Sequence, residues 1–292
     1  MTSTSVKTER AGEAVPPQPQ APRKRSKAVS RGSTGKAFFG SRGFRIVTLI
    51  ILLIVVWQLL ATYVITSRLI FTSPIEVAQY MVEAAQSGEL WADVSASAIV
   101  FVIGYVSAAI IGIPAGLILG NNRRFREWIE PLLNGLYATP MLALAPILIA
   151  LLGLGFIPKA IIVFLECIFP VIIGTMVGVT TTNKLLVEAG AVYGARGRRA
   201  MIYVYLPSSV PNIIAGLRLA VGRGIIGVII AELFGSTVGL GNNIWFASQT
   251  LDMPSLYSSV IILASASIGG MAFLAWIQKK VAPWAVDEKK RR

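Results

Sequence analysis

Long apolar stretches recur along this chain, and their length constrains the fold more than any other feature. At a rise of about 1.5 Å per residue, a helix needs about 20 residues to cross about 30 Å of hydrocarbon. Charged residues make up only 14% of the chain, against about 25% in soluble domains. The sequence therefore predicts an all-α integral membrane protein with six transmembrane helices, at residues 44–65, 93–119, 132–152, 157–180, 210–234 and 257–278.

The basic residues indicate how these helices are oriented. The formal net charge is +13. Loops and tails with many Lys and Arg residues are 1–43, 121–128, 183–200 and 279–292, whereas the intervening loops hold only Arg68 and Lys159. Cytoplasmic segments of membrane proteins carry such an excess. We therefore expect both termini in the cytoplasm, and the positive charge gives no support to a nucleic acid partner.

The two ends differ in composition from the transmembrane domain, residues 44–278. Residues 1–43 mix Ser, Pro, Gln and Gly with basic residues and show no periodic apolar face, which is typical of a disordered tail. We expect a solvated cytoplasmic extension, and attraction of this tail to anionic lipid or nucleic acid is the alternative. Residues 279–292 are expected to form a second basic cytoplasmic tail.

The residue types restrict the possible chemistry. The sequence contains no His and a single cysteine, Cys167, within an apolar run. This excludes His-based catalytic pairs, a His-ligated metal site and an intrachain disulfide. The chain also lacks the G-x-x-x-x-G-K-[ST] pattern of a phosphate-binding loop. We therefore expect no enzyme activity, no bound cofactor and no metal site in this chain.

The loop between the fourth and fifth predicted helices, residues 183–207, contains the most informative pattern. It begins as a short helix with an acid at Glu188, continues through a basic cluster at Arg196–Arg199, and reaches Leu206-Pro207. We expect the proline to break the helix. Small residues on an exposed helix let another protein approach the backbone closely. A docking helix and an ordinary interfacial loop both fit this composition.

The spacing in this loop resembles that of a known family. Glu188-Ala189-Gly190, Gly194, Val204 and Leu206-Pro207 follow the pattern E-A-A-x3-G-x9-I-x-L-P, with Gly190 replacing Ala and Val204 replacing Ile. That pattern is the EAA loop of binding-protein-dependent ABC importer permeases of type I. Gly216-Leu217-Arg218, Ala231-Glu232 and Gly239-Leu240-Gly241 resemble the subgroup that imports nitrate, taurine and alkanesulfonates.

In that family the loop forms a coupling helix that sits in a groove of a cytoplasmic ATPase subunit. The resemblance assigns polar contact with the ATPase to Glu188, close packing in its groove to Ala189, Gly190 and Gly194, and the end of the motif to Leu206 and Pro207. ATP and Mg would then be bound by the ATPase. A Gly194→Asp change is expected to lower transport while membrane insertion survives.

The resemblance also implies the other components of the system. It implies a pair of ATPase subunits, an extracytoplasmic solute-binding protein and a second permease copy, expected as a homodimer in a bacterial plasma (inner) membrane. The expected function is alternating-access import of a small organic anion such as a sulfonate, taurine, nitrate or a carboxylate. An ion-coupled secondary transporter is the alternative, although it would have no need of the EAA spacing.

Ionisable residues inside the predicted helices are candidates for the translocation path. A charge at a helix centre costs about 2.5–3.5 kcal/mol on insertion scales, so it should face protein or water. Glu166 and Arg223 fall near mid-membrane. They form an ion pair, or Arg223 is a transient counter-charge for an anionic solute. Glu232 lies near the outer end, where we expect it to cap or gate the path together with the glycine-rich segment after it.

Glycine and proline positions predict helix packing and bends. Pro140 and Pro146 are expected to bend the third helix. Gly239–Asn243 is expected to form an outward-facing turn, and the amphipathic segment Pro74–Ala85 is expected to lie at the membrane interface. Four glycines of the second helix share one face and permit a close helix contact: Gly104, Gly112, Gly116 and Gly120.

Overall fold

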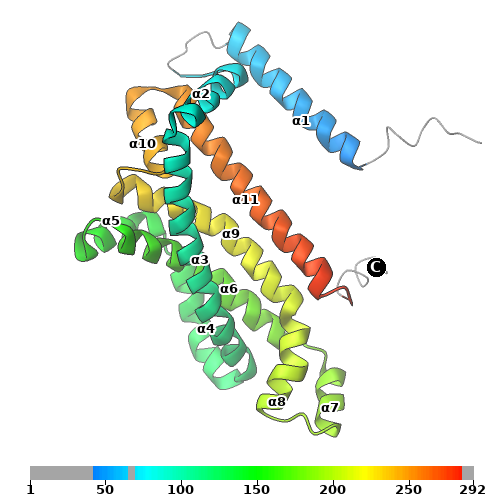
Figure 1. The fold of residues 1–292 in the computed structure, drawn as a ribbon. Helices are drawn as coiled ribbons and strands as arrows, with labels where there is room; N and C mark the ends of the chain where they lie inside the picture. Colours follow the sequence, from blue (N-terminus) through cyan, green and yellow to red (C-terminus); the bar gives the residue numbers. More distant parts are fainter. Residues whose placement is uncertain (1–41, 65–69, 285–292) are drawn as a thin grey trace, which may run out of the picture. The chain divides into compact units, whose positions relative to one another are not determined.

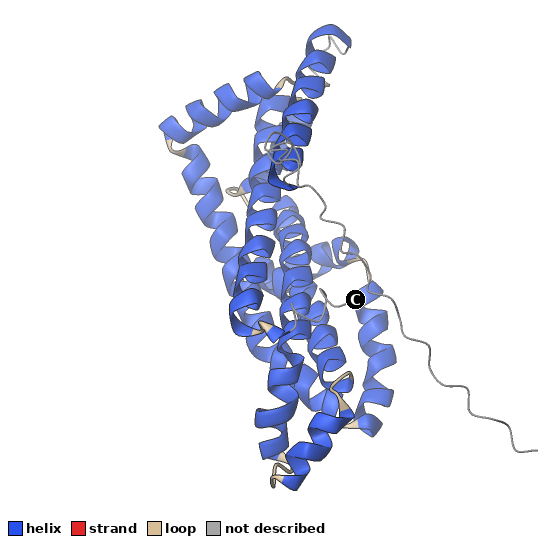
Figure 2. Cartoon of the chain, turned by 90° about the vertical axis from the view of Figure 1, so that its right-hand side faces the viewer, coloured by secondary structure: helices blue, strands red, loops and turns tan. Residues whose placement is uncertain are grey.

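The computed structural model describes residues 42–64 and 70–284, and all regular structure within them is helical (Figure 2). The all-α fold class is therefore confirmed. The predicted tails at residues 1–43 and 279–292 lie largely outside the described residues. Residues up to Ile51 form a unit separate from Leu52–Arg292, and the packing below concerns the second unit.

The helices follow one another along the described residues from α1 to α11 (Figure 1). They are α1 (Arg42–Leu59), α2 (Pro74–Ser87), α3 (Glu89–Asn121), α4 (Arg123–Ala138), α5 (Met141–Leu152), α6 (Phe156–Thr180), α7 (Lys184–Val192), α8 (Arg198–Ala200), α9 (Leu206–Gly235), α10 (Leu240–Thr250) and α11 (Met253–Val281). Wider π-helical turns occupy Leu60–Val64 and Met201–Tyr205. Within the described part of the chain, five helical runs are long and apolar enough to cross a membrane, at 44–64, 89–121, 156–180, 198–235 and 253–281.

The third predicted membrane helix, residues 132–152, is not one helix. α4 ends at Ala138, α5 begins at Met141, and the two are bent by 89°. Pro140 cannot donate a backbone hydrogen bond, and it holds the preceding Thr139 in an extended conformation at ψ 129°. The predicted bend is confirmed at Pro140, whereas the prediction of a single helix over residues 132–152 was wrong. The pair supplies a sixth span only if α4 and α5 together count as one.

The central helices α3, α6 and α9 run side by side (Figure 1). The predicted glycine face of α3 makes this packing possible, because any side chain there would collide with α6. A Cβ at Gly104, Gly112, Gly116 and Gly120 would lie 2.5–2.9 Å from atoms of Val163, Val171, Thr175 and Val179, respectively. The prediction of a close helix contact is confirmed.

α6 and α9 approach each other through a pair of glycines, one on each helix. A Cβ at Gly174 would lie 2.7 Å from the Cα of Gly216. The sequence pattern did not reveal this pair, because each glycine has to be matched with a partner on a different helix. The close approach brings the polar residues of α6 and α9 within contact distance.

The fifth span begins earlier than predicted. The helical path runs without a break from Arg198 through the π turn Met201–Tyr205 into α9. The prediction that Leu206-Pro207 breaks the helix is therefore wrong. A π turn uses a longer bonding interval than an α-helix, and this wider turn lies immediately before Pro207, whose nitrogen has no hydrogen to donate to the preceding turn.

The glycine-rich segment after α9 also differs from its prediction. Gly239–Asn243 forms no isolated turn, because α10 begins at Leu240 with Gly239 as its N-cap residue. Gly239 takes φ +130°, which L side chains rarely adopt. The segment is therefore the start of a helix whose first N–H groups need acceptors.

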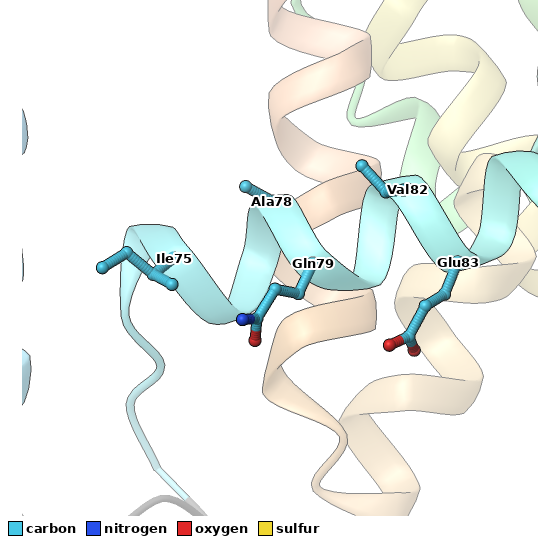
Figure 3. A pocket seen from close by; sticks show the side chains of 5 residues that line it. All are labelled: Ile75, Ala78, Gln79, Val82 and Glu83. Carbon is cyan, nitrogen blue, oxygen red and sulfur yellow. The ribbon is translucent and has the colours of Figure 1, made fainter.

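α2 matches the predicted amphipathic segment and extends it to Ser87. Its exposed side includes both apolar and polar side chains. Figure 3 shows Ala78 and Val82 at the upper edge of the helix, Gln79 and Glu83 at its lower edge, and Ile75 near its N-terminal end. The placement of this helix at a membrane interface stays a prediction.

Candidate functional site

Loop 183–207 contains a short helix with defined ends. Asn183 caps α7, because its side chain accepts a hydrogen bond from the Leu185 N–H at 3.0 Å. After α7, Gly194 takes φ +79°, and the Ala195 N–H donates to the Gly190 carbonyl at 2.8 Å. A left-handed residue of this kind is normally glycine. Gly194 therefore closes the helix by its backbone conformation, a role that its spacing alone did not reveal.

The residues predicted for docking differ in exposure. Glu188, Ala189 and Gly194 are exposed, whereas Gly190 is half-buried. A Cβ at Gly190 would lie 2.8 Å from the Cγ2 of Val204. The two positions that depart from the EAA pattern thus contact each other. Gly190 packs against this chain, whereas the family resemblance placed it only against a partner.

The loop also presents apolar surface that the motif does not include. Val192 is 85% exposed and Tyr193 is 91% exposed. At the far end of the loop, Leu206 is half-buried and Pro207 is exposed. The sequence did contain a signal for this apolar surface, because Val192 and Tyr193 stand directly before Gly194, where the helix ends.

A groove of about 340 Å³ lies beside α7. α7 contributes Lys184, Val187 and Glu188 to its lining, α4 contributes Arg126, and the π turn contributes Tyr205. Residues from the C-terminal ends of α3 and α6 complete it. The ends of the central helices and α7 therefore share one surface.

Glu166 of α6 and Arg223 of α9 form an ion pair, which was one of the two alternatives predicted for them. Arg223 Nε lies 3.0 Å from Glu166 Oε2, and neither atom has a hydrogen-bond partner. The Glu166 side chain is 4% exposed, whereas the Arg223 side chain is 32% exposed. The pair is therefore buried on the carboxylate side and open on the guanidinium side.

Tyr137 of α4 is a third member of this cluster. The Arg223 guanidinium lies over the Tyr137 ring, 4.9 Å from its centroid, and Arg223 Nη2 donates to the Tyr137 carbonyl at 3.4 Å. A guanidinium over an aromatic face is attracted by the ring. No signal in the sequence pointed to Tyr137, because it lies 86 positions from Arg223 and only the tertiary fold brings the two residues together.

The Glu232 carboxylate is fully enclosed. Glu232 has no exposed surface, and it accepts hydrogen bonds from Ser97 Oγ and from the Gly241 N–H, both at 2.8 Å. Ser97 Oγ also accepts from the Leu240 N–H at 2.9 Å. A Cβ at Gly239 would lie 2.5 Å from the Glu232 carboxylate. Glu232 therefore binds the start of the glycine-rich segment, and its expected role in capping or gating the path stays a prediction.

The titratable groups thus fall into separate clusters and do not converge on one site. Within residues 42–64 and 70–284, no three His, Cys, Asp or Glu side chains gather as a metal ion would require. What the arrangement offers chemically is a half-open guanidinium between helices and an exposed loop at their ends.

Residues 112–286 match the family model described as a binding-protein-dependent transport system inner membrane component. The match begins within α3 and continues through α11. It includes loop 183–207 and all three ionisable residues predicted for the path.

The chain is also similar to transport proteins over most of its length. It is 27% identical to a Bacillus subtilis permease named for the transport of aliphatic sulfonates, over 90% of this chain and 94% of that protein. It is 26% identical to the Escherichia coli taurine transport system permease, over 80% and 86%. It is 27% identical to the formylaminopyrimidine transport permease of Halalkalibacterium halodurans, over 80% and 93%.

The fold is similar to that of a chain from the MetNI methionine ABC transporter, solved in inward-facing conformations. The TM-score is 0.51 at 17% sequence identity, over 66% of this chain and 95% of that chain. At this identity the likeness concerns the fold alone.

Proposed function

The chain belongs to the family of binding-protein-dependent transport system inner membrane components, and we propose that a cytoplasmic ATPase subunit drives it through loop 183–207. The chain is a multi-pass permease of the ABC transporter type. As the membrane subunit it would leave ATP and Mg to the ATPase. Family membership removes the support for an ion-coupled secondary transporter.

The exposure of α7 and its C-terminal end is the observation that supports this docking role best. Glu188 and Ala189 are exposed on α7, and Val192 and Tyr193 leave almost all of their surface uncovered by the chain. Exposed aromatic residues are frequent anchors of protein interfaces. We infer that Tyr193 enters the ATPase groove and that Glu188 makes a polar contact at its rim.

The contact between Gly190 and Val204 offers a mechanical link from the docked helix to the membrane. Val204 belongs to the π turn that continues directly into α9. A shift of α7 would therefore be transmitted to α9 and, through the close contact at Gly174 and Gly216, to α6. Packed helices of this kind move as rigid elements between discrete arrangements. Alternating access would follow from that movement.

The remaining components are proposed from family membership. An extracytoplasmic binding protein would deliver the solute to a homodimer of this permease in the bacterial plasma membrane, with both termini in the cytoplasm. The names of two relatives favour a small sulfonate as the solute. The half-open guanidinium of Arg223 supports an anionic solute. Because another relative is named for the transport of formylaminopyrimidine, an uncharged solute is the other outcome that an experiment has to distinguish.

Ala189→Asp tests the docking role directly. Ala189 is exposed, so the added carboxylate costs this chain little, but it would bring bulk and an unpaired charge into the ATPase groove. We expect the ATPase subunit to be lost from the purified complex and ATP-driven uptake to fall by about tenfold or more, equivalent to about 1.4 kcal/mol of docking energy.

Gln249→Asp is the matched control, since Gln249 is exposed on α10 and outside the loop. It should leave the complex and uptake unchanged, with equal amounts of both variants in the membrane. Normal co-purification and uptake of Ala189→Asp would refute the docking role. Gly194→Asp is a weaker test, because φ +79° strains any residue other than glycine.

A further inference from the structure

Arg223 has the features of a binding residue for an oxyanion. Its side chain is 32% exposed, its Nε faces the Glu166 carboxylate at 3.0 Å, and its Nη2 makes only a long bond of 3.4 Å to a carbonyl. A guanidinium presents planar donors that match the oxygens of sulfonates and carboxylates. Arg223 therefore has binding capacity that this chain does not use.

Glu166 is placed to limit the strength of such binding. Its side chain is only 4% exposed, and Oε2 faces Arg223 without a hydrogen-bond partner. In the empty state the carboxylate offsets the charge of Arg223. An arriving anion then has to compete with Glu166, so it gains only the difference between the two interactions. A translocation path requires binding that is weak enough for release.

Tyr137 limits the direction from which an anion can reach Arg223. The aromatic ring covers one face of the guanidinium at 4.9 Å, and Glu166 lies at the Nε edge. The exposed part of the guanidinium is what remains for a solute. The position of Tyr137 follows from α4, which ends one residue later at Ala138, ahead of the bend at Pro140.

We propose that Arg223 binds the oxyanion group of the solute during transport, and that Glu166 is a positioning residue that holds the guanidinium and weakens this bond enough for release. The proposal rests on the permease function above and names the chemical class that the path recognises. It concerns residues of α6 and α9 and is independent of the docking of α7.

The test uses the purified full-length permease in lipid nanodiscs, without an ATPase, at constant ionic strength. The probes are sodium ethanesulfonate and sodium propionate, and ethyl methyl sulfone is the uncharged control. The measurement is the thermal unfolding midpoint as a function of probe concentration. A rise in this midpoint with an anionic probe, and none with the sulfone, is expected for the unmodified chain. A response to ethanesulfonate alone narrows the class to sulfonates, and a response to both supports oxyanions in general.

The variants separate binding from folding. Arg223→Gln should need an anion concentration about tenfold higher or more, as for the loss of a charged hydrogen bond. Glu166→Gln should respond at a concentration about tenfold lower, because the competing carboxylate is gone. Arg218→Gln removes the same charge from the same helix, where Arg218 contacts Gln278, and should respond like the unmodified chain.

The double variant Glu166→Gln/Arg223→Gln keeps the test decisive if Arg223→Gln folds poorly. It removes both charges of the pair, so assembly should recover while the anion response stays absent. An anion response in the double variant equal to that of the unmodified chain would overturn the proposal. So would the absence of any response in both the unmodified chain and Glu166→Gln. Ala189→Asp should keep the response, so failure here is distinguishable from failure of the docking role.

Discussion

Glu232 and Glu166 are both buried carboxylates within membrane-spanning helices, but their surroundings differ. Glu232 has no exposed surface and accepts hydrogen bonds from Ser97 and the Gly241 N–H. Glu166 faces a single guanidinium that is itself one-third exposed, and its Oε2 lacks a hydrogen-bond partner. One carboxylate is saturated by donors of its own fold, and the other is held by a group that an anion can reach.

The difference shows that burial alone does not reveal the role of a membrane carboxylate. A buried acceptor surrounded by fixed donors stabilises the fold, because moving it would leave those donors unpaired. A buried charge with one movable partner can exchange that partner. The following changes ought to separate the two cases, with effects on stability that decrease from Glu232 to Glu166.

Glu232→Ala should have the largest effect on stability. The change leaves Ser97 and the Gly241 N–H without their acceptor, at about 1–3 kcal/mol for each buried donor, and also creates a cavity. We expect a loss of about 4 kcal/mol, measured as the thermal unfolding midpoint of the solubilised permease and as its folded yield. Glu232→Gln keeps the shape and one oxygen, and should lose less. A stable Glu232→Ala protein would show that the hydrogen bonds of Glu232 with Ser97 and Gly241 are dispensable for folding.

Gly239→Ala should come next. Its Cβ would lie 2.5 Å from the Glu232 carboxylate, at a φ of +130°, so the change adds both a collision and backbone strain of about 1–3 kcal/mol. Gly88→Ala is the matched control, since Gly88 also has positive φ but no atom within 4 Å of its Cβ. Equal losses for both variants would mean that strain, and not the contact with Glu232, is responsible.

Ser97→Ala should have a smaller effect. Ser97 Oγ bridges Glu232 and the Leu240 N–H, but the carboxylate keeps its bond to Gly241. We expect a loss of about 1–2 kcal/mol in the same unfolding measurement. Ser95→Ala on the exposed face of α3 serves as the control. If Ser97→Ala were as unstable as Glu232→Ala, Ser97 would make the main contribution of this cluster to stability.

Glu166→Gln should have the smallest effect on stability. Arg223 keeps its exposure and its contact with Tyr137, so the charge that loses its partner stays one-third open to its surroundings, and Gln keeps the shape of Glu and an oxygen that faces the guanidinium. The unfolding midpoint is expected to stay nearly unchanged, while solute uptake by the assembled transporter changes. A large loss of stability would place Glu166 in the same class as Glu232 and remove the contrast between them.

Loop 183–207 shows how far the sequence pattern could be taken. The spacing from Glu188 to Pro207 was sufficient to locate the loop and its short helix. The exposure of Tyr193 and the contact between Gly190 and Val204 required the fold. The predicted break at Pro207 was wrong, and the helix continues through it. The rule that proline breaks helices does not anticipate a π turn immediately before the proline.

The helices themselves were predictable where the determinants are local. The lengths of the apolar runs gave the long membrane helices, and the spacing of Gly104, Gly112, Gly116 and Gly120 gave one packing face. The third span required knowledge of the backbone at Thr139 and Pro140, where a single extended residue turns the chain by 89°. Hydropathy does not reveal such a break, because the residues on both sides of it can be apolar.

The sequence by itself determined that this chain is a helical membrane protein of the permease family, because hydrophobic length and motif spacing lie within continuous segments. Only the tertiary structure showed which partner each buried charge contacts. Ser97 and Glu232 are 135 positions apart, and Glu166 meets Arg223 only because α6 and α9 touch at their glycines. Electrostatic energy depends on distances between side chains in space, and those distances are set by how the helices pack.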